Sequence, residues 1–109
     1  MPPVPKPIDA NELNDRLGRG EKLVVLDVRE PQEVAICAIS GAVHIPMQEI
    51  PARFGELDPK ATTVVYCHHG MRSNMVGGFL LQQGFEDVAN LNGGIARWAD
   101  LVDPGMARY

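Results

Sequence analysis

One short segment of the chain contains the residue types that nucleophilic sulfur chemistry requires. An apolar run ends at Tyr66, and Cys67-His68-His69-Gly70-Met71-Arg72-Ser73 follows it, directly before a helical pattern. A cysteine at the end of a buried strand faces the first turn of the next helix, whose unpaired N–H groups and dipole favour thiolate over thiol. Because the thiolate is the nucleophilic form, the segment predicts that Cys67 is a reactive nucleophile.

Other residues of this segment fit the same chemistry. Arg72 places a full positive charge five residues after the sulfur, and Gly70 allows the positive φ that a tight loop often needs. Successive N–H groups of such a loop can converge on an anion. Ser73 is expected either to hydrogen-bond the sulfur or to cap the following helix. The predicted substrate-binding loop is completed by His68, His69 and Met71.

Two other interpretations of Cys67 remain open on the residues alone. A free cysteine is usually a small buried hydrophobe without reactivity. A metal site would have to use Cys67, His68 and His69, but three adjacent residues form a poor tetrahedral set, and the sequence has no Cys-x-x-Cys pair to add to them. We therefore expect neither a metal nor another cofactor.

Hydrophobic patterning predicts the elements that must position this loop. Short apolar, β-branched runs are typical of strands buried on both faces, and apolar stripes between them predict helices. The predicted strands are Ile8, 22–28, 42–46, 61–66 and 88–91, and the predicted helices are one capped by Asp9 and those at 31–36, 47–54, 72–83 and 95–101. This alternation predicts an α/β fold with a parallel sheet covered on both faces. Ligands of such sheets bind at the carboxyl ends of strands, where Cys67 lies.

The helix after the loop carries specific packing predictions. Its apolar stripe should face the core and consists of Met75, Val76, Phe79 and Leu80. Gly84 is the expected C-cap. Gly77 and Gly78 each lower helix stability by about 1 kcal/mol relative to alanine. Close packing of this helix on the sheet would explain both glycines.

Length and composition limit the class of protein. The chain has 109 residues and a formal net charge of −4, which fits one domain, 1–109, and argues against a general nucleic-acid binder. No apolar run is long enough to span a membrane, and the proline-rich N-terminus lacks a signal-peptide core, so we expect a cytoplasmic location. We expect 1–7 to be an extended, frayed segment and 102–109 to be a C-terminal tail. In a reducing compartment, Cys37 and Cys67 should be free thiols.

Four segments, in order along the chain, resemble the rhodanese family of sulfurtransferases. The loop from Cys67 to Ser73 is similar to that family's active-site loop. The other three segments are 26–31 (Leu-Asp-Val-Arg-Glu-Pro), 39–46 (Ile-Ser-Gly-Ala-Val-His-Ile-Pro) and 90–98 (Asn-Leu-Asn-Gly-Gly-Ile-Ala-Arg-Trp). The resemblance implies a rhodanese-like α/β fold, with a five-stranded parallel sheet and helices on both faces.

The resemblance also implies a reaction. A sulfane-sulfur donor such as thiosulfate would transfer sulfur to Cys67 as a persulfide, and a thiophilic acceptor such as cyanide or a cellular thiol would remove it. Arg72 would bind the anionic group of the donor and offset the charge of the departing sulfite. The implied partners are small sulfur-containing anions and thiols, and a protein could serve as the acceptor. Nucleic acids and membranes are not expected partners.

Two residues of a neighbouring strand end are expected to support this loop. Asp27 and Arg29 should reach the same sheet edge as Cys67. Asp27 is expected to brace the loop through its backbone N–H groups or through Arg72. Arg29 is expected to pair with a carboxylate such as Glu33, and direct contact with substrate is the alternative.

The second cysteine marks a departure from the family pattern. Cys37 and Ala38 stand where family members often have Gly-His. We expect Cys37 to be an inert, packed cysteine that lies away from the loop. The alternative is a resolving thiol that forms a disulfide with Cys67.

Three other functions compete with sulfur transfer. Related phosphatases and arsenate reductases have five residues between their cysteine and arginine, whereas four lie between Cys67 and Arg72. The shorter loop suits a sulfur atom better than a tetrahedral phosphate. A persulfide carrier or sensing module, acting with a protein partner, would use the same loop chemistry. An inactive interaction domain is disfavoured because both Cys67 and Arg72 are present.

Overall fold

The fold is built around one five-stranded parallel sheet. A computed structural model describes residues 3–109 of the chain. The strands have the order β1-β5-β4-β2-β3. Every neighbouring pair is parallel, and this parallel pairing confirms the prediction from the sequence. They are β1 (Lys6–Ile8), β2 (Leu23–Asp27), β3 (Val43–His44), β4 (Thr62–Tyr66) and β5 (Asp87–Leu91). The central strand β4 leads directly into the loop that begins at Cys67.

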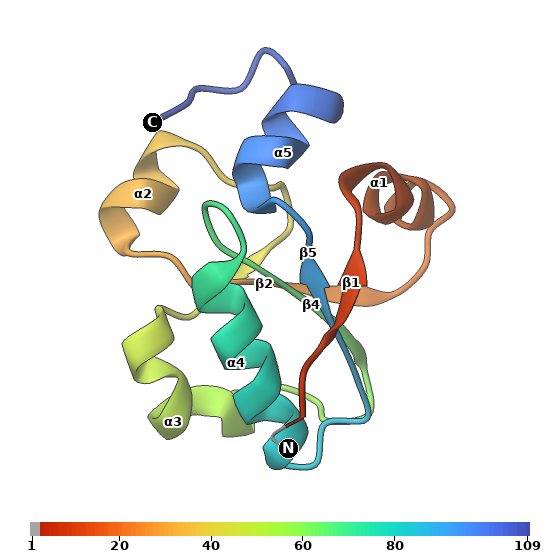
Figure 1. Cartoon of the computed structure of the whole chain (residues 1–109), viewed down its shortest axis with the longest axis vertical. Coiled ribbons are helices and arrows are strands. Elements are labelled where there is room, and N and C mark those ends of the chain that lie inside the picture. Colours follow the sequence, from red (N-terminus) through yellow and green to blue (C-terminus); the bar gives the residue numbers. More distant parts are fainter. Residues whose placement is uncertain (1–2) are drawn as a thin grey trace.

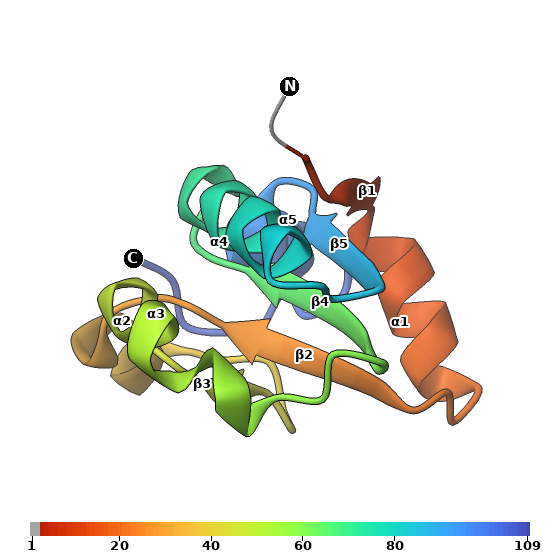
Figure 2. The ribbon, with the colours of Figure 1, turned by 90° about the horizontal axis from the view of Figure 1, so that it is seen from below.

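Helices cover both faces of this sheet. They are α1 (Ala10–Gly18), α2 (Pro31–Ile36), α3 (Ile50–Arg53), α4 (Met71–Gln82) and α5 (Gly94–Leu101), with short 3₁₀ turns at Met47–Glu49 and Phe54–Glu56 on either side of α3. The single helix predicted at 47–54 is therefore three short pieces. The predicted helix at 31–36 is confirmed, and Asp9 caps α1 by accepting a hydrogen bond from the Glu12 N–H. Figures 1 and 2 show α1 and α4 on opposite sides of β4 and β5.

Alternation along the strands divides the core into two layers. Val64 and Tyr66 of β4 face a layer closed by α1 and α5, which includes Leu13, Ile95 and Trp98. Val65 and Cys67 face the other layer, closed by α3 and α4, which includes Ile50, Val76 and Leu80. Cys67 directly follows β4 and continues this alternation, so its side chain points towards the N-terminal half of α4.

The N-terminal segment is more ordered than the sequence predicts. Pro5 is buried and Lys6–Ile8 forms an edge strand, so the expected fraying is wrong for these residues; Met1 and Pro2 lie outside the described part of the chain. A Cβ on Gly77 would lie 2.7 Å from Pro5 Cγ. Gly77 is thus required because Pro5 of the N-terminal segment lies against it, and the atoms nearest to such a Cβ belong to Pro5 and not to the sheet.

The exposure of one residue on α4 differs from the prediction. Met75 does not join the apolar stripe of α4: its side chain is 60% exposed, and Val76 and Leu80 form the buried face. Among the residues described, no helix combines the length and apolar character that crossing a membrane would require.

Candidate active site

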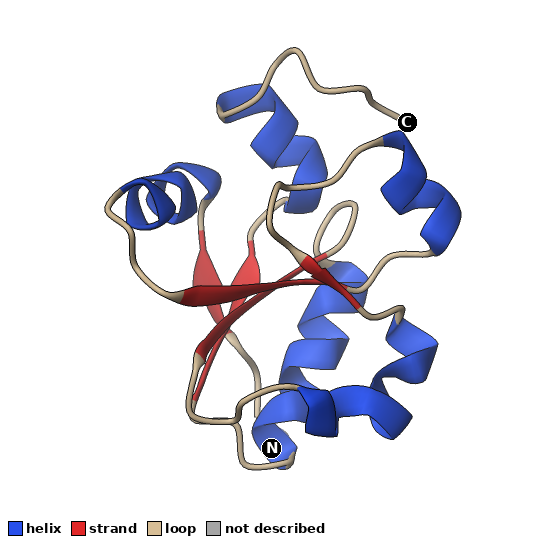
Figure 3. Ribbon diagram, turned by 180° about the vertical axis from the view of Figure 1, so that it is seen from behind, coloured by secondary structure: helices blue, strands red, loops and turns tan. Residues whose placement is uncertain are grey.

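The loop that follows β4 is held in place by the start of α5. The Cys67 carbonyl accepts a hydrogen bond from Ile95 N–H at 2.9 Å, and the His68 carbonyl accepts one from Ala96 N–H at 3.1 Å. A Cβ on Gly94 would collide with the His68 carbonyl, so this approach requires glycine. Figure 3 shows the loop in tan at the start of α4, beside α5. The Gly93-Gly94 pair therefore forms the turn before α5 and also allows the loop to approach closely.

The Cys67 sulfur lies in a cradle of hydrogen-bond donors. Sγ is 3.1 Å from Gly70 N, 3.5 Å from Ser73 N and 3.3 Å from Ser73 Oγ. Gly70 begins α4 with a φ of +118°, a value that favours glycine and turns its N–H towards the sulfur. Cys67 itself is only 2% exposed. Loop and first helical turn therefore converge on one atom, as the sequence predicts.

These donors favour the thiolate. Burial raises the pKa of Cys67, but hydrogen bonds from the Ser73 hydroxyl and from the N–H groups of Ser73, Gly70 and Arg72 outweigh burial, and the pKa is lowered from its usual value of 9.0. Each of these groups stabilises the charged form directly. The site can therefore hold sulfur-centred negative charge with little access to water.

Ser73 connects the sulfur to Asn90, a residue that the sequence analysis missed. Ser73 is fully buried, and its hydroxyl donates to Asn90 Oδ1 at 2.5 Å, while Asn90 Nδ2 donates to the Gly70 carbonyl at 3.1 Å. The hydroxyl has one hydrogen, which can serve either the amide oxygen or a thiolate. Ser73 does not cap α4, because the N-cap position is held by Gly70. Its side chain contacts the sulfur, which was the other of the two expected roles. A polar residue near the end of an apolar strand was the available signal for Asn90.

Arg72 is paired with a carboxylate. Its guanidinium binds Glu33 in a bidentate ion pair, with Nη1–Oε1 at 2.7 Å and Nη2–Oε2 at 2.9 Å. This pair lowers the pKa of Glu33 from 4.5 to about 2. Arg29 does pair with a carboxylate, as expected, but this carboxylate is that of Asp27 and not that of Glu33. Glu33 sits in the first turn of α2 and faces Arg72, whereas Arg29 reaches only its backbone carbonyl, at 3.4 Å.

Asp27 and Arg29 form a separate, buried network. Both are at most 1% exposed, and Asp27 accepts hydrogen bonds from Arg29 N, Nε and Nη2 at 3.0, 3.0 and 2.7 Å and from Tyr66 Oη at 2.7 Å. Asp27 was predicted to brace the loop by binding the N–H groups of the loop or Arg72, and this prediction is wrong. Both carboxylate oxygens of Asp27 accept from Arg29 or Tyr66 instead. The alternative of direct substrate contact by Arg29 stays a prediction; its side chain is fully buried and paired with Asp27. The network instead links α2 to the sheet. Arg29 binds Asp27 at the end of β2 and also donates to the carbonyl of Cys37, the C-cap of α2, at 2.7 Å.

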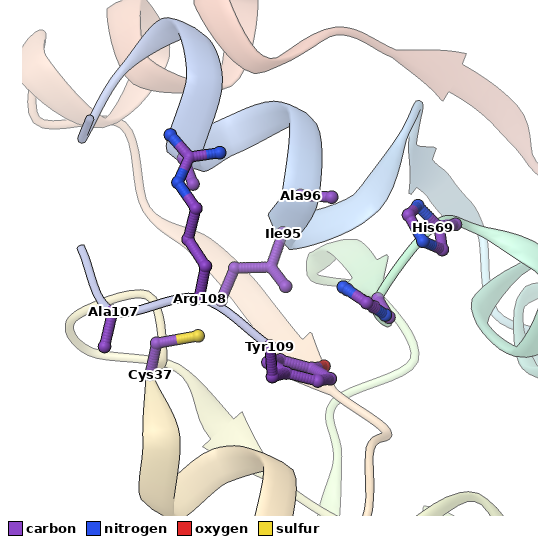
Figure 4. Close-up of a pocket in the computed structure, with 9 residues that line it drawn as sticks. Cys37, His69, Ile95, Ala96, Ala107, Arg108 and Tyr109 are labelled. Atoms are coloured by element: carbon purple, nitrogen blue, oxygen red, sulfur yellow. The ribbon is translucent and has the colours of Figure 1, made fainter. Parts of the chain in front are cut away.

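The two cysteines belong to different layers of the core. Cys37 packs against the layer that contains Tyr66 and Trp98, whereas Cys67 belongs to the layer beneath α4. Cys37 is half-buried and lines a pocket of ≈ 170 Å³ together with His68 and His69. Its packed role agrees with expectation, but its separation from the loop does not, because the side chains of two loop residues share its pocket (Figure 4).

The C-terminal segment returns to this region. Residues 102–109 contain no helix or strand, and the C-terminus lies beside α2 (Figure 1). The Tyr109 hydroxyl donates to Glu33 Oε2 at 2.8 Å and accepts from Arg29 Nη1 at 3.0 Å. Its ring stacks on His68, with centroids 4.1 Å apart. His69 and Met71 are exposed, and Met71 is 80% accessible. No pattern in the sequence connects Tyr109 with the loop.

Comparison with known proteins agrees with this geometry. The model of the rhodanese-like domain family matches residues 9–101. A sulfurtransferase of Allochromatium vinosum is 40% identical over 92 residues, which cover 84% of this chain and 86% of that protein. The thiosulfate sulfurtransferase GlpE of Pseudomonas aeruginosa is 39% identical over 77 residues, which cover 71% of this chain and 70% of that protein.

A solved structure agrees in the same way. The crystal structure of a rhodanese-like domain protein from Staphylococcus aureus superimposes with a TM-score of 0.83 at 31% identity, covering 89% of this chain and 94% of the other. The matched family segment contains the whole loop from Cys67 to Ser73 and ends before Tyr109. The chain belongs to the family of rhodanese-like domains.

Proposed function

We propose that this protein is a sulfurtransferase that moves sulfane sulfur from a donor to a thiophilic acceptor through a persulfide on Cys67. General sulfur transfer is supported by the family and by relatives named sulfurtransferases. The observation that carries the assignment to Cys67 is its buried Sγ with three donors within 3.5 Å. An inert packed cysteine has no need of such donors.

The reaction needs no net oxidation or reduction. The Cys67 thiolate attacks the outer sulfur of thiosulfate, the new S–S bond forms on Sγ, and the old S–S bond breaks as sulfite leaves with its electron pair. The product is a persulfide anion whose terminal sulfur carries the charge. Cyanide or a thiolate then attacks that terminal sulfur, leaves as thiocyanate or a new persulfide, and restores the Cys67 thiolate.

The cradle suits both halves of this cycle. N–H and O–H donors placed near developing charge stabilise it most when they are fixed before reaction. Gly70 is fixed by its contact with Asn90, and Ser73 by its burial in α4. Arg72 supplies the positive charge for an anionic donor, and His68, His69 and Met71 complete the substrate-binding loop. Small sulfur-containing anions and thiols are the proposed partners, and a protein thiol is a further candidate acceptor.

The phosphatase alternative is weaker on this geometry. With four residues between Cys67 and Arg72, the N–H groups of Gly70 and Ser73 converge on the sulfur itself. A phosphate would need several of these groups arranged around its oxygens at about 2.7–3.1 Å.

Intact mass spectrometry tests the proposal directly. Protein treated with thiosulfate should gain one sulfur atom, which dithiothreitol removes. Cys67→Ser should form no adduct and lose at least about a thousandfold in turnover, because a hydroxyl stays neutral and is a poor nucleophile. Cys37→Ser is the matched control and should retain most activity, since Cys37 packs in the other layer.

The same assay separates the carrier alternative and would expose an error. Fast turnover with thiosulfate and cyanide identifies an enzyme of small molecules, whereas a stable adduct with slow turnover favours a persulfide carrier that needs a protein partner. Turnover of Cys67→Ser within tenfold of the parent would contradict the mechanism. Efficient hydrolysis of aryl phosphate by a parent that forms no persulfide would replace it with the phosphatase reading.

A further inference from the structure

The mouth of the active site contains an internal anion. Glu33 holds Arg72 through two short hydrogen bonds of 2.7 and 2.9 Å, and this geometry is the one by which a guanidinium binds an oxyanion. Glu33 therefore occupies the face of Arg72 formed by Nη1 and Nη2, one of the two faces by which its guanidinium could bind the oxyanion group of a donor such as thiosulfate. The pair is only partly buried, with side-chain exposures of 33% for Arg72 and 17% for Glu33, so it faces the solvent from which a donor arrives.

Tyr109 fixes this internal anion. Its hydroxyl donates to Glu33 Oε2 at 2.8 Å and is itself anchored by Arg29 Nη1 at 3.0 Å. Its ring lies on His68, a loop residue, and Figure 4 shows Tyr109 between Cys37 and His69. Glu33 is also fixed from its own helix, because Oε1 accepts from the Glu30 N–H at 2.9 Å. The carboxylate thus has three separate restraints, counting Arg72, and none of them depends on a ligand.

Two other arginines near the loop are already paired with carboxylates. Arg29 is buried and paired with Asp27 at 2.7 Å, and Arg108, which lines the adjoining pocket, pairs with Asp100 at 2.5 Å. Burial and the neighbouring His69 lower the pKa of His68, which disfavours a positive charge on that ring. The formal net charge of the whole chain is −4. A thiosulfate dianion would have to displace Glu33 or approach it closely.

We propose that Glu33, positioned by Tyr109, is a specificity determinant that takes the place of a donor oxyanion on Arg72, so that the site favours alkyl persulfides over inorganic dianions such as thiosulfate. This inference rests on the proposed function, because it concerns the donor for Cys67. The favoured step is balanced: the Cys67 thiolate attacks the terminal sulfur of R–S–SH, the Cys67 Sγ–S bond forms, the donor S–S bond breaks, and the thiolate R–S⁻ leaves with its electron pair. An alkyl persulfide needs no oxyanion site, so Glu33 leaves its path unchanged.

Two substitutions test the inference. Glu33→Gln removes the charge, and its single amide oxygen can take the place of Oε1 and still accept from Glu30 N–H, which protects the fold of α2; the contact of Oε2 with Tyr109 is then lost. Tyr109→Phe removes only the hydroxyl and keeps the stacking on His68. Glu21→Gln is the matched control. Glu21 is likewise paired with arginine, in its case Arg16 and Arg19, and plays no part in the site. Thermal unfolding verifies that each variant is folded.

The readout is single-turnover formation of the Cys67 persulfide, followed by quenched intact mass at increasing donor concentration. The probes are thiosulfate and the persulfide of 2-mercaptoethanol. Glu33→Gln should lower the half-saturating thiosulfate concentration about fivefold, the scale of a partly exposed ion pair, and Tyr109→Phe about twofold. The maximal rate and the half-saturation by the alkyl persulfide should change by less than about twofold, as should every value for Glu21→Gln.

Other results overturn the inference. They are an unchanged or higher thiosulfate half-saturation in Glu33→Gln, and an equal change for both donors, which would mean a general effect on the thiolate. If no donor forms a persulfide on the parent, the proposed function fails, and a separate measurement decides the inference. Sulfate should then protect Cys67 of Glu33→Gln from iodoacetamide at lower concentration than in the parent; protection at the same concentration would refute a role for Glu33 in excluding oxyanions.

Discussion

Two arginine–carboxylate pairs lie at the same end of the sheet, and they differ in burial and in role. Asp27 and Arg29 are at most 1% exposed, and their polar atoms are bound to one another, to Tyr66 and to the C-terminal end of α2. Glu33 and Arg72 are 17% and 33% exposed and stand at the entrance of the cysteine loop. The chemistry of the two pairs is the same. Solvent access decides that the first holds the fold together and that the second can open to a ligand.

The physical reason lies in the cost of separating each pair. A buried ion pair contributes little net stability when intact, but removal of one partner leaves an unpaired charge without water, which is strongly destabilising. A partly exposed pair can exchange its partner for water or for another ion at low cost. Evolution of a binding site can therefore use the second kind of pair and not the first. The predictions below test this distinction.

The largest expected effect is on the buried pair. Asp27→Asn should lower the free energy of unfolding by about 3–5 kcal/mol, because it leaves the Arg29 charge buried without compensation. Urea unfolding measures the change. Glu33→Gln is the matched control and should lose less than about 1 kcal/mol. Equal losses in the two variants would contradict the division between a structural pair and an exchangeable one.

The hydroxyl of Tyr66 should show the next largest effect. Tyr66 Oη donates to Asp27 Oδ2 at 2.7 Å and accepts from Ile39 N–H at 3.1 Å, and both bonds are buried. Tyr66→Phe should therefore lower the free energy of unfolding by about 1–3 kcal/mol, since two buried groups lose a partner. Tyr109→Phe, which removes a part-exposed hydroxyl, should lose less than about 1 kcal/mol. A harmless Tyr66→Phe would show that Asp27 is satisfied by Arg29 alone.

Arg72 should affect activity more than stability. Arg72→Ala should slow persulfide formation from thiosulfate at least about tenfold, equivalent to 1.4 kcal/mol in the barrier, through loss of the donor's binding charge. Its removal should also raise the Cys67 pKa and move the pH profile of iodoacetamide labelling upwards. Arg72→Lys should restore only part of the rate, because an ammonium cannot make the bidentate contact. A labelling profile identical to that of the parent would mean that the Arg72 charge does not act on the sulfur.

The smallest effect concerns acid stability. Glu33 has a pKa of about 2 in the folded protein against its usual 4.5, so the unfolded chain binds this proton more tightly. The contribution of Glu33 to stability is therefore complete above about pH 4.5 and is lost as the pH falls towards 2. Solvent screening limits it to less than about 1 kcal/mol. The stability difference between the parent and Glu33→Gln, measured by urea unfolding, should shrink between pH 5 and pH 2; a constant difference would show that Glu33 is not stabilised by charge.

Local sequence patterns determined much of this protein. The strand before Cys67, the glycine at position 70 and the helix after it are all set by neighbours along the chain, and so the loop and its nucleophile could be predicted. Helix boundaries at 31–36 and the strand alternation followed from the same short-range rules. The cradle around Sγ is a local structure too, because its donors lie within six residues of the sulfur.

Partnerships between distant side chains were decided only by the tertiary structure. The sequence offers carboxylate partners for both Arg29 and Arg72. Arg29 was the expected partner of Glu33, but Arg72 is the one that binds it. Asp27 and Arg29 are two residues apart and pair inside the core, whereas Glu33 and Arg72 are brought together by the packing of α2 beside the loop. Asn90 and Tyr109 reach the site from β5 and from the end of the described chain. No local pattern encodes such contacts, because an arginine or tyrosine side chain is long enough to reach several acceptors, and the chain path selects which one it meets.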